Sequence, residues 1–344
     1  GIGICKKNFS GGTRNMMGMF VAPSPEEKFR LIREARLSPD HLLSVSELCR
    51  ISGVSRSGYY RWEAATASRN QREIQDQVDF ALILEAYRHR GYAKGARSIY
   101  MRLLHLTPPV CMNIKKIRRL MSKYGLECPI RKANPYRRAL KDMRTNAVAP
   151  NLLQREFRSH GPRKVLLTDI TYLFYGEHHR AYMVTILDAY TKRLLAYSVS
   201  RSMEIDFVLN AVNQLVAEHG VSLYAETLIN SDQGSHYTSR KFIHLVQDYH
   251  LRQSMSRKAN CWDNAPQESF FGHMKDELNL VSCRSFDDLL NRIADWVDYY
   301  NYDRYQWALA KLSPVEYETF LETGIYPIDK PAPNDPFAKH PNAP

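Results

Sequence analysis

The chain of 344 residues lacks the sequence features of membrane and secreted proteins. It has no run of about 18 consecutive apolar residues, the length that crosses a bilayer, and residues 1–21 lack the continuous apolar core of a secretory signal. Its six cysteines form no Cys-x-x-Cys pair and no cluster with histidine at zinc-ligand spacing. These absences predict a cytoplasmic protein with reduced thiols and neither a zinc site nor a disulfide framework.

Acidic residues are scarce in the first part of the chain. Residues 1–150 hold 28 Lys and Arg against 12 Asp and Glu, a net charge of +16, whereas the remainder holds 20 against 24, a net charge of −4. A cationic front half favours a polyanionic partner, so we expect DNA or RNA to bind there. The length predicts two or more domains.

Residues 25–70 carry the signals of a helix-turn-helix. Ser44 and Glu47 form a capping box that starts a short helix, Gly53 ends this helix, and a second helix restarts after a short turn. The residues of this second helix that we expect to face DNA are Ser55, Arg56, Ser57 and Tyr59. A helical hairpin with a solvated face is the alternative.

Residues 71–130 predict a second helical domain of the helix-turn-helix type. In residues 113–125, apolar side chains recur at the spacing of one helix face, and basic side chains fill the other positions. The basic residues that we expect to face DNA here are Lys115, Lys116, Arg118 and Arg119, although a solvated face is again the alternative. Residues 131–160 are interpreted as a basic linker that orders on DNA phosphates. Because the chain begins with Gly, residues 1–24 are interpreted as a disordered tag or frameshift-region segment.

After residue 160 the periodicity changes to that of an α/β layer. The expected strands are residues 165–174, 181–189, 193–200, 227–231 and 251–256. The expected helices between and after them are residues 204–219, 239–249 and 264–278. The order β-β-β-α-β-α-β-α predicts a ribonuclease-H-like core with a mixed five-stranded sheet over residues 161–282, preceded by the all-α domains. Residues 283–344 are predicted to form a C-terminal helical extension and tail.

Three acidic residues stand out in this layer. Asp169 interrupts an apolar strand, where an unpaired buried charge would be costly; Asp232 ends a strand; and Glu268 lies on the third helix. Carboxylates about 4 Å apart repel by roughly 4 kcal/mol per pair at an effective dielectric near 20, so such a cluster makes sense as a cation cage. Mg²⁺ prefers carboxylate oxygens, and two Mg²⁺ ions activate the nucleophile and stabilise the leaving 3′ oxygen in phosphodiester cleavage. Mn²⁺ is expected to substitute.

Other interpretations of these acids stay open. Alone, each has an ordinary role as a strand-edge, turn or surface carboxylate. Asp188, at the end of the second strand, and Asp263, beside a helix start, are competing acids. On the third helix, Asn264 and Lys275 share a face with Glu268, and we expect both to contact DNA.

The residues around these acids resemble a known family. The motifs that carry the resemblance are Ser-Arg-Ser-Gly-Tyr-Tyr-x-Trp at 55–62, Lys-x-Ile-Arg-Arg-Leu-Met at 115–121, Thr-Asp-Ile-Thr-Tyr at 168–172, Ser-Asp-Gln-Gly-Ser-His-Tyr-Thr-Ser at 231–239, Ser-Met-Ser-Arg-Lys at 254–258, Asp-Asn-Ala-Pro-x-Glu-Ser-Phe-Phe at 263–271 and Tyr-Asn-x-x-Arg at 300–304. From about residue 42 to 320 the chain is similar to the OrfB-type DDE transposases of bacterial insertion-sequence family number three, in the retroviral-integrase superfamily. Asn230, Ala259 and Gln306 depart from the family's usual residues.

The resemblance implies a function and a set of partners. It makes Asp169, Asp232 and Glu268 the DDE triad that holds two Mg²⁺ ions, with Lys275 as the basic residue that follows the Glu. It implies a copy-out, paste-in reaction: one strand is nicked at an element end, its 3′-OH attacks beside the other end, and a circular intermediate integrates later. The implied partners are double-stranded DNA with terminal inverted repeats, target DNA, further copies of the chain in a homodimer or higher oligomer, and an upstream OrfA-type subunit, in the bacterial nucleoid.

Two rival functions follow from the same residues. The first is a transposase-derived DNA-binding repressor without catalysis, in which the three carboxylates are dispensable. The second is a ribonuclease-H-like nuclease that cuts DNA and never joins it. The presence of all three acids argues against the repressor, and the large basic front half argues against a simple nuclease.

Overall fold

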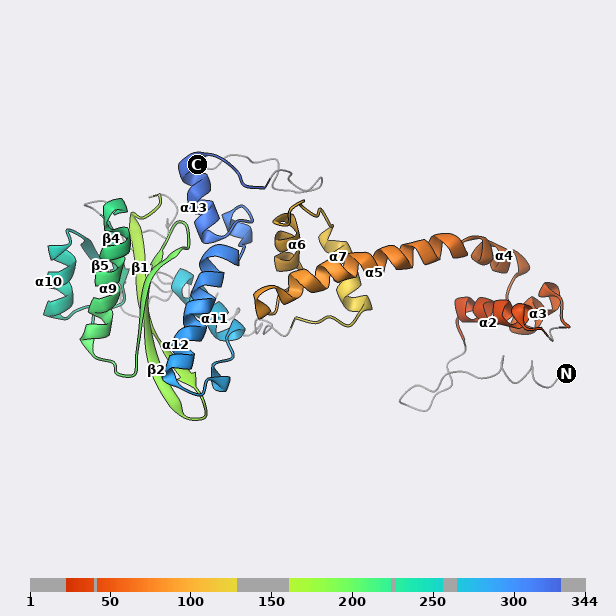
Figure 1. Ribbon diagram of the computed structural model, residues 1–344, viewed down its shortest axis with the longest axis horizontal. Coiled ribbons are helices and arrows are strands. Elements are labelled where there is room, and N and C mark those ends of the chain that lie inside the picture. The colour runs from red at the N-terminus through yellow and green to blue at the C-terminus, as the bar shows by residue number, and fades with distance from the viewer. Residues whose placement is uncertain (1–22, 40–41, 129–160, 224–226, 256–264, 329–344) are drawn as a thin grey trace, which may run out of the picture. The chain divides into compact units, whose positions relative to one another are not determined.

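The computed structural model describes residues 23–39, 42–128, 161–223, 227–255 and 265–328 (Figure 1). The chain divides into two compact units, Gly1–Asp79 and Phe80–Pro344, and the boundary falls within one helix, α5 (Thr66–Arg88). The predicted linker, residues 131–160, and most of the predicted N-terminal segment lie outside the described residues. The domain boundaries drawn from the sequence stay predictions.

Within its described residues, the first unit holds three short helices that begin at serine caps. They are α2 (Pro25–Leu37), α3 (Val45–Ser52) and α4 (Arg56–Ala64). The capping box expected at Ser44 is present: the Ser44 hydroxyl accepts a hydrogen bond from the backbone of Glu47, whose carboxylate accepts one in return. Gly53 ends α3 with φ +65°, a conformation that costs glycine little.

The first turn of α4 itself needs a glycine for space. A Cβ atom at Gly58 would lie 2.8 Å from the Ser55 hydroxyl oxygen and 3.1 Å from the ring of Phe29 on α2. Glycine therefore allows α2 to approach α4 closely. The resulting core contains Ile32, Leu48, Cys49 and Tyr59.

The second unit begins with a small helical module. After α5 come a 3-10 turn (His89–Gly91), α6 (Ala96–Leu104) and α7 (Ile114–Lys123). The alternating apolar and basic positions of α7 place Ile117 and Leu120 in the interior, as its periodicity predicts. Residues from the C-terminal part of the chain, among them Tyr305 and Leu312, complete this core, so the module and the C-terminal extension share one hydrophobic cluster.

The centre of the second unit is the mixed five-stranded sheet expected from the sequence. Its strands are β1 (Val165–Tyr175), β2 (His179–Asp188), β3 (Leu194–Ser200), β4 (Leu228–Ser231) and β5 (Arg252–Met255). They lie in the order β3-β2-β1-β4-β5. The first three form an antiparallel meander, and β1, β4 and β5 pair in parallel.

Helices cover both faces of this sheet (Figure 1). On one face lie α9 (Ile205–His219), which a 3-10 turn (Gly220–Ser222) follows, and α10 (Arg240–Asp248). On the other face lie α11 (Ala265–Glu277), a 3-10 turn (Leu280–Ser282) and α12 (Phe286–Asp298). Phe270, Phe271 and Met274 of α11 pack against β1 and β2, as the helical spacing of these residues predicts.

The C-terminal extension continues from α12 as a π-helical turn (Tyr299–Asp303), a 3-10 turn (Trp307–Leu309) and α13 (Pro314–Thr323). It docks on the sheet through side chains. The Asn301 amide bonds both the N–H and the carbonyl of Leu194 at the start of β3, and buried Glu318 pairs with Arg163 and Arg193. In the described part of the chain, no helix is both long enough and apolar enough to span a membrane.

Candidate active site

The first candidate acid, Asp169, lies in the middle of β1. It is the register partner of Thr185 on β2, is half-buried, and its Oδ1 accepts a hydrogen bond from the N–H of Ile170 at 2.8 Å. Side chains alternate along a strand, so Asp169 shares a face with Thr171 and Leu173. Leu173 packs in the cluster that α11 covers, so Asp169 points to the α11 side of the sheet.

The second candidate, Asp232, follows the end of β4. The last parallel pair between β1 and β4 is Leu167 with Asn230, so the same register continued by two residues brings Asp232 level with Asp169. Neighbouring strands are about 4.8 Å apart, so this register favours neighbouring positions for the two residues. Asp232 is exposed, and its Oδ1 accepts the N–H of Gly234 at 2.9 Å. A Cβ at Gly234 would lie 2.9 Å from that oxygen, so the turn requires glycine.

The third candidate, Glu268, is exposed on the first turn of α11. Lys275 lies seven residues further on, about two helical turns, and so projects from the same side of the helix. The Lys275 ammonium donates to Thr171 Oγ1 at 2.6 Å, and burial lowers its pKa while the charge of Asp169 opposes this shift. The side of α11 that carries Glu268 therefore faces the strand that carries Asp169. Asn264 lies outside the described residues.

The donor chemistry of these acids fits a hard divalent cation, because all three candidates supply carboxylate oxygens. The register of β1 and β4 favours neighbouring positions for Asp169 and Asp232, and the Lys275–Thr171 bond lays the helix that carries Glu268 along β1. Among the described residues, no three His, Cys, Asp or Glu side chains already stand close enough to hold one ion. The three candidates thus lie on elements that pack against one another, with Asp232 and Glu268 exposed.

Tyr237 is a buried neighbour that our sequence analysis did not single out. Its side chain is 1 % exposed, and its hydroxyl hydrogen-bonds Thr168, the residue before Asp169, at 3.2 Å. Burial raises the pKa of Tyr237 well above its usual value, and the charges of Asp169 and Asp232 add to the increase. The phenol therefore stays protonated and ties the loop after Asp232 to β1. Its place within Ser-His-Tyr-Thr-Ser was the only signal in the sequence.

Asp188, the competing acid on β2, has a structural role. It is fully buried, and its carboxylate accepts hydrogen bonds from the backbones of Tyr190 and Thr191 and from the Thr191 hydroxyl at 2.6 Å. Burial raises its pKa, and these hydrogen bonds partly offset the increase. Asp188 thus shapes the turn between β2 and β3. The other competitor, Asp263, lies outside the described residues.

Comparisons with known proteins identify the family of the chain. An integrase core domain family matches residues 159–261, a second integrase core domain family matches residues 268–320, and an HTH-like domain family matches residues 73–134. An uncharacterized transposase-like protein of Haemophilus influenzae is 33% identical over 218 residues, which cover 62% of this chain and 96% of that protein. The chain belongs to the transposases of bacterial insertion sequences.

Two relatives from Escherichia coli narrow the family of this transposase. The putative transposase InsK for insertion sequence element IS150 is 28% identical over 79% of this chain and 93% of its own. The transposase InsF for insertion sequence IS3A is 26% identical over 80% of this chain and 94% of its own. Both match the OrfB-type resemblance drawn from the motifs, and the transposase is an enzyme of the DDE transposase and integrase class.

Among solved structures, the transposase is similar to the HTLV-2 integrase catalytic core domain in complex with magnesium. The TM-score is 0.37 at 18% identity, and the match covers 46% of this chain and 97% of that one. Since this TM-score is low, the family assignment rests on the sequence relatives and the family matches.

The transposase presents most of its candidate DNA-facing residues at the surface. Ser55, Arg56 and Ser57 are exposed around the start of α4, although the Ser55 hydroxyl also caps the helix by accepting from Gly58. The expectation for Tyr59 was wrong: it is fully buried in the core of the first unit, where its hydroxyl bonds Glu63. The following residue, Tyr60, is the exposed member of the pair. Helical rotation explains the error, since adjacent residues differ by about 100°.

On α7, the basic candidates surround the buried stripe. Lys115, Arg118 and Arg119 are exposed and Lys116 is half-buried. Asn113 caps the helix by accepting the N–H of Lys115 at 2.8 Å. The basic face of α7 is therefore accessible to a polyanion.

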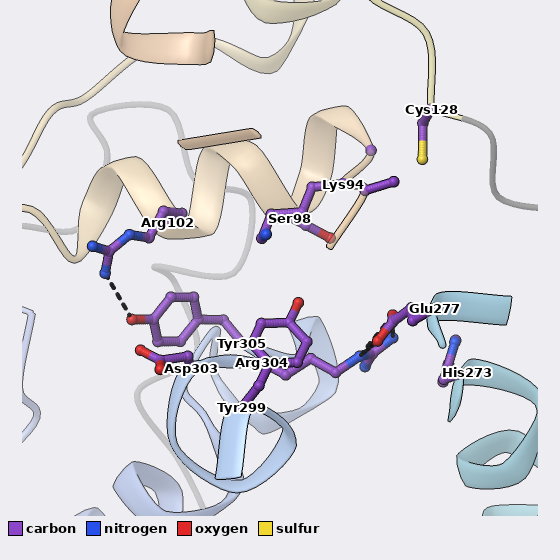
Figure 2. A pocket seen from close by; sticks show the side chains of 12 residues that line it. Lys94, Ser98, Arg102, Cys128, His273, Glu277, Tyr299, Asp303, Arg304 and Tyr305 are labelled. Atoms are coloured by element: carbon purple, nitrogen blue, oxygen red, sulfur yellow. Dashed lines mark hydrogen bonds and ion pairs between the residues drawn. The ribbon is translucent and has the colours of Figure 1, made fainter. Parts of the chain in front are cut away.

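The transposase also contains a cavity of about 270 Å³ beside the last turn of α11, and several charged side chains line it (Figure 2). Figure 2 shows Arg304 directed at Glu277, with Lys94 across the cavity. Glu277 accepts from Arg304 Nε at 3.0 Å and from Trp296 Nε1 at 2.9 Å. Lys94 donates to the carbonyls of His89 and Tyr92, and burial lowers its pKa to about 8. Glu277 and Lys94 thus make their hydrogen bonds to other groups of the protein. We therefore interpret the cavity as a structural contact between the helical module, α11 and the C-terminal extension.

Proposed function

We propose that Asp169, Asp232 and Glu268 are the catalytic triad of this transposase and hold two divalent metal ions. The observation that supports the proposal is the parallel register of β1 and β4, which runs up to two residues before both aspartates, with Asp169 on the face of the sheet that α11 covers. Mg²⁺ fits an all-carboxylate donor set, and Mn²⁺ is the expected substitute. When bound, two such ions supply charge stabilisation at the attacking and leaving oxygens of a phosphodiester.

The chain's own residues prepare this chemistry. Asp169 is held on a central strand, so its carboxylate has little freedom, whereas Asp232 and Glu268 present exposed oxygens. Lys275, bonded to Thr171 beside Asp169, places a positive charge where a DNA phosphate has to approach. The protonated Tyr237 hydroxyl hydrogen-bonds Thr168 on β1 and so holds the loop after Asp232 against that strand. Together these groups bind and orient a DNA strand end.

The reaction proposed for this site is nicking at the 3′ end of the element followed by strand transfer, in the copy-out, paste-in order with a circular intermediate. The basic helices are proposed to hold the terminal inverted repeats, with residues 55–57 and the basic face of α7 against DNA. Joining two ends requires two sites, so a homodimer or higher oligomer on DNA is proposed, with an OrfA-type subunit as a further partner.

A strand-transfer assay tests the proposal. Purified protein is incubated with labelled DNA that carries the element's ends, in Mg²⁺, Mn²⁺ or EDTA. We expect metal-dependent nicking and joined product from the wild type and from Glu322→Gln, an exposed carboxylate on α13, and neither from Glu268→Gln. Cutting without joining would replace the proposal with a hydrolytic nuclease. DNA binding without chemistry in all three proteins would favour a repressor.

A further inference from the structure

The residue directly before Glu268 is a fully buried amide. Gln267 is 0% exposed, although glutamine is usually a surface residue. A buried amide is stable only when its donors and acceptor are satisfied, so its partners show what it does. Its position in the motif, between Pro266 and Glu268, gave no hint of burial.

Gln267 bonds both central strands beside Asp169. Its Nε2 donates to the carbonyl of Leu167 on β1 at 2.6 Å, and its Oε1 accepts from Thr185 Oγ1 on β2 at 3.1 Å. Thr185 is the register partner of Asp169, and Leu167 lies two residues before Asp169 on the same face. Since a carbonyl only accepts, the amide nitrogen has to face Leu167, which leaves the amide oxygen for the Thr185 hydroxyl. The amide is thus fastened to the part of the sheet that carries Asp169.

A second bond fastens the other end of α11 to the same strand. The Lys275 ammonium donates to Thr171 Oγ1. Lys275 lies eight residues after Gln267 on α11, and Thr171 lies four residues after Leu167 on β1. Eight helical residues rise about 12 Å. Four strand residues span about 13 Å. The helix therefore lies along β1 with matched spacing, and two polar bonds oppose its sliding.

Apolar packing alone does not determine the rotation of α11 well. The contacts of Phe270, Phe271 and Met274 tolerate small shifts, because dispersion and burial are weakly directional. A rotation much smaller than the roughly 100° between adjacent residues would already displace the Glu268 carboxylate relative to β1. The two hydrogen bonds of the buried Gln267 side-chain amide are directional, and they disfavour that rotation.

We propose that Gln267 is a positioning residue, which holds the first turn of α11 so that Glu268 meets Asp169 and Asp232. This inference rests on the proposed function, because it takes Glu268 to be a metal-holding carboxylate. Gln267 itself touches neither metal nor DNA. Residues that orient metal ligands typically change metal affinity or activity by about 10- to 100-fold when they are lost.

The chain offers a matched control in Gln214. This glutamine on α9 also bonds a strand backbone, accepting from the N–H of Tyr197 at 3.3 Å, on the opposite face of the sheet. The test compares Gln267→Met, which keeps the length and loses the hydrogen bonds, with Gln214→Met. Thr185→Val removes one of the two hydrogen-bond partners of Gln267 with almost no change of side-chain shape. It tests the positioning role if Gln267→Met does not fold.

Two measurements are made on the full chain. The first is amide hydrogen exchange over Ala265–Phe271 without metal, and the second is the Mn²⁺ concentration that half-saturates DNA nicking. For Gln267→Met we expect faster exchange and a half-saturating Mn²⁺ concentration raised about tenfold, with activity partly recovered at high Mn²⁺. For Thr185→Val we expect the same direction with a smaller change, and for Gln214→Met wild-type values in both.

The outcomes separate the inference from the proposed function. Unchanged exchange in Gln267→Met, or faster exchange with an unchanged Mn²⁺ requirement, would overturn the positioning role. If Glu268→Gln retains wild-type nicking at the wild-type Mn²⁺ requirement, the proposed function fails and the inference fails with it. If Glu268→Gln is inactive while Gln267→Met matches Gln214→Met, only the inference is lost.

Discussion

The two ends of α11 carry glutamates in opposite environments. Glu268, on the first turn, is exposed, and the neighbouring Gln267 makes the hydrogen bonds that hold this end. Glu277, on the last turn, is 5% exposed at its side chain, and its oxygens accept from Arg304 and Trp296. A carboxylate whose oxygens are saturated by the protein stabilises the fold, whereas one whose oxygens are left accessible is free for a ligand.

The largest expected effect is on chemistry at the first end. In the proposed function Glu268 is a metal donor, and its replacement in Glu268→Gln removes no buried contact, so we expect DNA joining to fall by at least about a thousandfold, roughly 4 kcal/mol in the activation barrier. The free energy of unfolding should stay within about 0.5 kcal/mol of wild type, because the residue is exposed. Parallel strand-transfer and denaturant-unfolding measurements check both values. A large loss of stability in Glu268→Gln would mean that Glu268, like Glu277, stabilises the fold.

The next effect is on stability at the second end. Arg304→Leu leaves the Glu277 carboxylate buried without its cation, which should lower the free energy of unfolding by about 3 to 5 kcal/mol. Lys241→Met is the control, since the Lys241–Asp206 pair is 3.8 Å long and about 70% exposed on both sides, and should cost less than about 1 kcal/mol. Denaturant unfolding measures both. Equal losses of unfolding free energy in Arg304→Leu and Lys241→Met would contradict the stabilising role of the buried Glu277–Arg304 pair.

The smallest effect is a pH dependence at the cavity. The pKa of Lys94 is lowered to about 8 in the folded protein, chiefly by burial, against about 10.4 in an unfolded chain. Between these values the unfolded chain binds more protons, so this group makes stability rise with pH from about 8 to about 10.4, by up to about 3 kcal/mol. In Lys94→Met that rise is absent. Unfolding of both proteins at pH 8 and pH 10 tests this, and parallel pH profiles would refute it.

Much of the fold could be predicted because its signals are local. The serine caps at Ser44 and Ser55 and the turn at Gly53 act within a few residues, so pattern alone located them. The strands and helices of the sheet layer lie within a few residues of their expected ranges, since period-2 and period-3.6 patterns are one-dimensional. Tyr59 was misplaced because which side of a short helix meets the core depends on its partner, here Phe29.

In the candidate site, too, some residues could be proposed from the sequence and others only from the structure. Asp169, Asp232 and Glu268 could be proposed from their motifs, whereas the motif at 300–304, which contains Asn301 and Arg304, suggested only the family. The roles of Arg304 and Asn301 appear only where Arg304 reaches Glu277 and Asn301 reaches β3. Gln267 carried no signal, because a glutamine beside a surface helix residue looks solvated until the sheet beneath it is known.

The sequence by itself therefore determined the element order, the family and the three acids, because composition, periodicity and motif residues act or are recognised along the chain. The tertiary structure alone decided that β1 and β4 pair in parallel up to two residues before Asp169 and Asp232, that Glu268 is accessible while the oxygens of Glu277 are hydrogen-bonded, and that Gln267 and Tyr237 hydrogen-bond β1 beside Asp169. These facts depend on contacts between residues far apart in the chain, and such contacts exist only after the sheet has paired and the helices have packed on it.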